Sequence, residues 1–144
     1  MKVNFERSTP AGDRRWMVVD DDEDILTMMS AVLKGLTDAA VECHASPQSA
    51  LAAFNEAPDT YELVITDYEM PGMDGVELCR QLRAVSPSQR VFLATGSGFF
   101  TGATARRAGF SALLNKPFPP PLLKQALVEN SLLNERENFA LTSA

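Results

Sequence analysis

Five polar residues of this chain directly follow short apolar runs, and together their types suit one kind of chemistry. Asp20 and Asp21 follow "RWMVV", Asp67 follows "ELVIT", Thr95 follows "RVFLA", and Lys116 follows "ALLN". Carboxylate oxygens are the ligands that Mg²⁺ prefers. A carboxylate can also attack a phosphoryl group, while a hydroxyl and an ammonium group hold the other phosphoryl oxygens. If these side chains lie together, they indicate a metal-assisted site for phosphoryl transfer.

These residues can meet only if the elements before them belong to one sheet. The apolar runs alternate with helical patterns and occupy residues 15–19, 40–44, 62–66, 90–94 and 112–115. Five strands that alternate with helices predict a doubly wound α/β domain, in which helices cover both faces of a parallel sheet. Ligands of such sheets bind beside the carboxyl ends of the strands. The predicted fold therefore brings the five polar residues to one crevice.

The helical patterns between these strands differ in strength. Residues 24–34 place a set of apolar residues at the spacing of one buried helical face: Ile25, Met28, Met29, Val32 and Leu33. The pattern over 98–109 is weak because glycine disfavours a helix, and we expect a short or frayed helix there. We assign residues 14–134 to one domain, and read residues 1–13 and 135–144 as tails.

Composition limits the class of protein. The chain has 144 residues, 45% of them hydrophobic, which is enough for the core of one domain. Its net charge of −6 argues against nucleic acid as a direct partner, because phosphate binding needs clustered lysine and arginine. No apolar stretch approaches a membrane span and no signal peptide is evident, so we expect a cytoplasmic protein without a membrane partner. Cys43 and Cys79 lack metal-ligand spacing and are predicted to be buried free thiols.

Four segments carry a resemblance to a known family. They are "VVDDDEDI", "LVITDYEMPGMDGVEL", "VFLATGSG" and "LLNKPF", in this order and at predicted strand ends. Over residues 15–133 the chain resembles the receiver domain of two-component response regulators, a phosphate-switched signalling module. The resemblance implies a flavodoxin-like (βα)5 fold whose five parallel strands have the order 2-1-3-4-5.

The resemblance also implies a role for each polar residue. Asp67 would be the phosphoacceptor, and Lys116 and Thr95 would bind the phosphoryl oxygens. Mg²⁺, or Mn²⁺ in its place, would be bound directly by Asp21, by Asp67 and by the backbone carbonyl of Glu69, and through water by Asp20. Lys116 and Pro117 match the cis peptide bond of the family.

The acidic run "DDDED" is then expected to divide into two parts. Asp20 and Asp21 lie before the first helix, at the metal end. Asp22, Glu23 and Asp24 are expected to cap that helix and to complement its dipole.

The chain departs from the family in its predicted switch region, which comprises Thr95, Phe99, Phe100 and Leu113. In many receivers an aromatic residue three positions before the lysine moves with the active-site threonine, and here that residue is Leu113. We expect one of Phe99 and Phe100 to enter the core and the other to be exposed. The hypothesis is that phosphorylation orders the 96–109 segment and does not rotate an aromatic residue of the fifth strand.

The predicted function is that of a phosphoacceptor rather than an enzyme, with only slow self-catalysed phosphorylation and dephosphorylation. A histidine kinase, a hybrid kinase or a phosphotransfer protein would phosphorylate Asp67, and the face formed by helix four, strand five and helix five would shift. That face could bind a downstream protein or form a homodimer. Because only a short tail follows the last predicted helix, no DNA-binding output domain is expected in this chain.

Two alternatives remain open at this stage. One is a receiver-like binding module that is never phosphorylated, although no acid, threonine or lysine of the pattern is lost. The other is a phosphohydrolase with an aspartyl-phosphate intermediate, for which Glu69 would be the second carboxylate. The chain has no room for the cap domain that such enzymes usually carry.

Overall fold

One parallel sheet organises the chain, whose computed structural model describes residues 13–142. The strand order is β2-β1-β3-β4-β5, so the predicted doubly wound fold with order 2-1-3-4-5 is confirmed. The strands are β1 (Arg15–Val19), β2 (Ala40–His44), β3 (Tyr61–Thr66), β4 (Val91–Thr95) and β5 (Ala112–Asn115). The helices are α2 (Glu23–Lys34), α3 (Pro47–Glu56), α4 (Gly75–Val85), α5 (Gly102–Arg107), α6 (Pro120–Glu129) and α7 (Glu135–Thr142).

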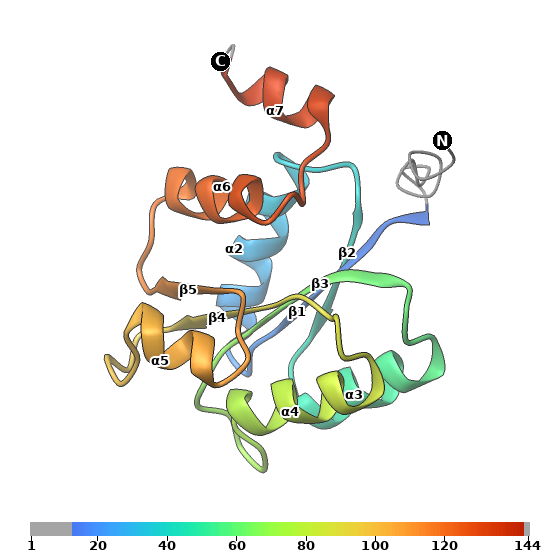
Figure 1. Ribbon diagram of the computed structural model, residues 1–144, viewed down its shortest axis with the longest axis vertical. Coiled ribbons are helices and arrows are strands. Elements are labelled where there is room, and N and C mark those ends of the chain that lie inside the picture. The colour runs from blue at the N-terminus through green and yellow to red at the C-terminus, as the bar shows by residue number, and fades with distance from the viewer. Residues whose placement is uncertain (1–12, 143–144) are drawn as a thin grey trace.

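Helices cover both faces of the sheet, with α2 and α6 on one side and α3 and α4 on the other (Figure 1). Successive side chains of the central strand β1 point to opposite faces of the sheet. Trp16 and Val18 pack beneath α2 and α6, whereas Met17 and Val19 pack against the helices on the other face. This two-sided burial explains why the central strands are almost continuously apolar. Within residues 13–142, no helix has the length and apolar character that a bilayer crossing requires.

Local hydrogen bonds fix the starts of α2 and α4. The Asp22 carboxylate accepts from the backbone N–H groups of Asp24 and Ile25, which confirms that this part of the acidic run caps α2. Asp74 caps α4 in the same way, through the N–H of Glu77. These caps place the start of each helix beside the carboxyl end of the strand before it.

Two local expectations differ from the structure, and that of a short helix within residues 98–109 is confirmed. The buried stripe of α2 is centred on Leu26, Met29 and Leu33, so Met28 falls on its flank and is 51% exposed. The weak helix is limited to α5, because its cap at Thr101 lies after the glycine-containing loop. Cys79 is buried as predicted, but Cys43 on the edge strand β2 is exposed, so the prediction of two buried thiols is wrong for Cys43.

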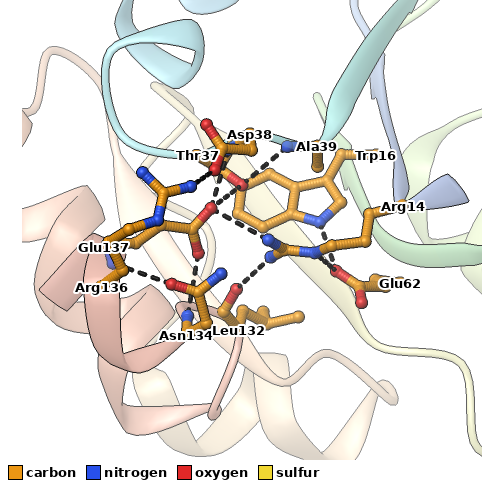
Figure 2. Close-up of polar contacts among 10 residues, drawn as sticks. All are labelled: Arg14, Trp16, Thr37, Asp38, Ala39, Glu62, Leu132, Asn134, Arg136 and Glu137. Atoms are coloured by element: carbon orange, nitrogen blue, oxygen red, sulfur yellow. Dashed lines mark hydrogen bonds and ion pairs between the residues drawn. The ribbon is translucent and has the colours of Figure 1, made fainter. Parts of the chain in front are cut away.

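A helix occupies part of the predicted C-terminal tail. α7 begins with a reciprocal cap, in which the N–H of Asn134 donates to Glu137 and the N–H of Glu137 donates to Asn134. Figure 2 shows the Glu137 carboxylate between Arg14 and the turn that contains Thr37. These partners are distant in sequence, which is why local patterns did not reveal the contact. Residues 1–12 and 143–144 of the expected tails lie outside the described residues.

Candidate functional site

The carboxyl ends of β1, β3 and β5 bring three charged side chains together. Lys116 Nζ lies 2.6 Å from Asp20 Oδ2 and 3.4 Å from Asp67 Oδ1. The backbone N–H of Asp67 donates to the carbonyl of Val19 at 2.9 Å, which holds the end of β3 against the end of β1. The parallel sheet therefore positions the lysine between two carboxylates that are far apart in sequence.

Asp20, Asp21 and Asp67 form an acidic cluster, since each offers a carboxylate oxygen within 4.8 Å of the other two. Asp20 is almost completely buried, at 3% exposure, whereas Asp21 is exposed. Both oxygens of Asp20 already have partners: the N–H of Asp22 donates to Oδ1 at 2.9 Å, and Lys116 donates to Oδ2. Asp21 and Asp67 are thus the carboxylates with more freedom to bind a cation directly.

The electrostatics of this cluster favour a bound cation. Burial raises the pKa of the Asp67 carboxyl; Lys116 offsets part of that rise, and the charge of Asp20 adds to it. A divalent cation among the carboxylates would reduce the repulsion, and three carboxylates at one edge are a donor set that suits Mg²⁺. The residues present therefore fit the metal that the resemblance implies.

Thr95 lies at the same edge, at the end of β4, and is 2% exposed. The N–H of Lys116 donates to the Thr95 carbonyl at 2.9 Å, which fixes the two residues side by side. The Thr95 hydroxyl accepts from the N–H of Ser97 at 3.1 Å, so its described partner belongs to the following loop. The peptide bond between Lys116 and Pro117 is cis, as expected.

The loop after Asp67 contains residues whose importance the sequence analysis did not identify. A Cβ atom on Gly75 would lie 2.2 Å from the backbone oxygen of Asp67, so the start of α4 approaches this loop too closely for any side chain. The N–H of Gly75 donates to the carbonyl of Tyr68 at 2.8 Å. The "DG" pair at residues 74–75 is the sequence signal for this close approach, since only glycine leaves room for the backbone of Asp67 there. The side chain of Glu69 is exposed.

Two of the predicted switch residues lie on the same side of the sheet as α3 and α4. Leu113 and Phe100 are partly buried against the same apolar cluster. Phe99 is 70% exposed. The expectation that one phenylalanine packs inward and the other faces solvent is confirmed.

Comparison with known proteins identifies the family. The model of the response regulator receiver domain matches residues 16–128. The chain belongs to this family. Receivers are components of two-component systems; they bind Mg²⁺ at an acidic site and interact with histidine kinases or phosphotransfer proteins.

Curated relatives of this receiver include regulators of larger size. It is 36% identical over 110 residues to the C4-dicarboxylate transport transcriptional regulatory protein DctD of Rhizobium meliloti, a match that covers 76% of this chain and 23% of DctD. It is 35% identical over 132 residues to the DNA-binding response regulator MtrA of Mycolicibacterium smegmatis, covering 90% of this chain and 56% of MtrA. The chain thus spans between about a quarter and about half of these relatives.

Solved structures of receiver domains support the assignment of this chain to the family. A receiver domain protein from Clostridium thermocellum superposes with a TM-score of 0.75 at 26% identity, covering 88% of this chain and 98% of that one. A CheY-like receiver domain protein from Methanospirillum hungatei gives 0.72 at 26% identity, covering 81% of this chain and 92% of that one.

Proposed function

We propose that Asp67 accepts a phosphoryl group from a histidine kinase, a hybrid kinase or a phosphotransfer protein. The observation that carries this proposal is the position of Lys116 Nζ, which lies within 3.4 Å of an oxygen of Asp67 and pairs with Asp20 beside it. An ammonium group beside an attacking carboxylate can bind the negative charge that the incoming group brings.

The acidic cluster would hold the metal. Asp21, Asp67 and the backbone carbonyl of Glu69 are the proposed direct ligands, and Asp20 is proposed to act through water. Because both oxygens of Asp20 have protein partners, an indirect role suits it. Bound Mg²⁺ would neutralise charge on the transferring phosphoryl oxygens.

Three residues, Asp67, Lys116 and Thr95, would act on the phosphoryl group during its transfer. An oxygen of Asp67 attacks phosphorus as the bond from phosphorus to the donor nitrogen breaks, and the donor imidazole leaves with the bonding electrons. Lys116 then pairs with one phosphoryl oxygen, and the Thr95 hydroxyl donates its proton in a hydrogen bond to another. The product is an aspartyl phosphate on this chain and a neutral histidine on the donor, once its nitrogen has bound a proton.

A small phosphodonor provides the direct test. The protein is incubated with phosphoramidate and Mg²⁺, and its intact mass is measured. Wild type should gain one phosphoryl group that hydroxylamine removes, because hydroxylamine cleaves acyl phosphates. Asp67→Asn should gain none. Asp24→Asn is the matched control, since Asp24 is an exposed carboxylate in the first turn of α2, and it should behave as wild type.

Each of the other possible results would contradict part of the proposal. A wild-type protein that binds Mg²⁺ but gains no phosphoryl group would overturn the proposal and favour a binding module that is not phosphorylated. Rapid, repeated release of inorganic phosphate from the donor would favour a phosphohydrolase. Retention of the adduct in Asp67→Asn would place the acceptor elsewhere.

A further inference from the structure

Three aromatic rings meet beside the proposed phosphoacceptor. Tyr68, the residue directly after Asp67, has its ring centroid 5.0 Å from that of Phe100 and 5.9 Å from that of Phe99. Both contacts are edge-to-face, with interplanar angles of 79° and 86°. This geometry is favourable for aromatic pairs and is lost when one ring moves away. The aromatic cluster of Tyr68, Phe99 and Phe100 thus joins the loop after β3 to the loop after β4.

The Thr95 hydroxyl is connected to the same rings by hydrogen bonds from backbone N–H groups to side-chain hydroxyls. It accepts from the N–H of Ser97 at 3.1 Å, and the Ser97 hydroxyl in turn accepts from the N–H of Phe99 at 3.2 Å. A change in the position of the Thr95 side chain therefore alters the support of the backbone that carries Phe99. Both Asp67 and Thr95 are thereby linked to the aromatic cluster, the first through the chain and the second through these bonds.

The two sides of the cluster differ in how firmly they are held. The carbonyl of Tyr68 accepts from the N–H of Gly75, and the close approach of Gly75 to Asp67 leaves this loop little freedom. On the other side, residues 96–99 are all exposed, and Gly98 has a φ of +77°. The loop after β4 is therefore the side that can move.

We propose that this aromatic cluster transmits the effect of Asp67 phosphorylation to the loop after β4. It would do so in place of an aromatic residue at position 113, which is leucine in this chain. When the Thr95 hydroxyl turns to the phosphoryl group, it withdraws from Ser97, and Phe99 and Phe100 change position against the Tyr68 ring. Leu113 packs in the same apolar cluster as Phe100 and Tyr68 but adds no aromatic contact of its own. The surface that changes is then that of the loop after β4, around Phe99. This inference rests on the proposed function.

Beryllofluoride with Mg²⁺, which mimics an aspartyl phosphate, tests the proposal on the full chain. ¹⁹F NMR of the bound fluoride measures whether the mimic binds, and amide hydrogen exchange over residues 96–101 measures the response of the loop. Wild type and Tyr68→Phe should both bind the mimic and change their exchange rates, because both keep the ring. Tyr68→Ala should bind the mimic with little change in exchange, and Phe99→Ala should lose part of the response. Leu113→Ala should respond as wild type.

The possible results separate the two proposals. If wild type does not bind beryllofluoride, the proposed function fails and this inference fails with it. If wild type binds it without a change in exchange over 96–101, only the inference is overturned. The inference is also overturned if Tyr68→Ala keeps the full response, or if Leu113→Ala loses it. Should Tyr68→Ala not fold, Phe99→Ala decides the same question, because Phe99 is 70% exposed and its removal should leave the core intact.

Discussion

Arg14 and Glu137 form a buried ion pair of 2.9 Å that joins the residue before β1 to the first turn of α7. Their exposures are 6% and 5%. The same Glu137 oxygen also accepts from the hydroxyl of Thr37 and from the N–H of Asp38, at 2.9 Å and 2.7 Å. Arg14 further donates to the carbonyl of Leu132 at 3.1 Å. α7 is therefore part of the folded domain.

Glu137→Ala should destabilise the protein strongly, because Thr37 and Asp38 lose their acceptor and the buried Arg14 guanidinium keeps only Glu62 as an ion-pair partner. The free energy of unfolding should fall by about 3–5 kcal/mol, the cost of breaking a buried pair from one side. Urea unfolding followed by circular dichroism measures it. Arg136→Ala on the same helix is the control: its pair with Asp38 is exposed, so the loss should stay below about 1 kcal/mol. Equal losses in the two variants would contradict the assigned role of Glu137.

The two parts of the acidic run should respond differently to substitution. Asp21→Ala should lose Mg²⁺-dependent phosphorylation with little change in stability, because Asp21 is exposed and belongs to the carboxylate cluster. Asp22→Ala should keep phosphorylation but lose about 0.5–2 kcal/mol, since it removes the cap of α2. Phosphoramidate labelling and urea unfolding of both variants provide the measurements. If the two variants behave alike, the division of the run is incorrect.

Gly75→Ala should destabilise the loop of the phosphoacceptor. The added methyl group would lie 2.2 Å from the backbone oxygen of Asp67, so the loop or the start of α4 must shift. We expect a loss of about 1–3 kcal/mol, as for overpacking, with slower phosphorylation of Asp67. Gly102→Ala is the matched control. The added methyl group would lie 3.8 Å from the guanidinium end of the Arg106 side chain, and alanine favours the helix, so stability should hold or rise.

Tyr61 should titrate well above an ordinary tyrosine. Burial, together with the hydrogen bond that it donates to Glu42, raises the pKa of Tyr61 to about 12. Since the pKa in the folded state lies above the value of about 10 for an unfolded chain, this group stabilises the fold below about pH 10. That contribution is lost as the pH rises toward about 12. Phenolate absorbance, compared between wild type and Tyr61→Phe, isolates the titration; a Tyr61 midpoint near 10 would contradict the prediction.

The parts of the structure that could be predicted are those fixed by local sequence. The apolar runs predicted the bounds of each strand to within one residue. Because the strands are parallel, they also predicted that Asp20, Asp67 and Lys116 lie at one edge of the sheet. α7 was missed although "NERE" carries a capping pair, because its stability depends on Arg14, more than a hundred residues away. The aromatic cluster was missed for the same reason: Tyr68 and Phe100 look like separate loop residues until the sheet brings them together.

The burial of Asp20 has a consequence for cation binding at the site. Its carboxylate is held from two sides, by the N–H of Asp22 and by the Lys116 ammonium, before any ligand arrives. The entropy needed to order this side chain is therefore paid during folding and does not weaken cation binding. The negative field in the crevice is preorganised, and an incoming cation has to reorient only the more exposed carboxylates, Asp21 and Asp67.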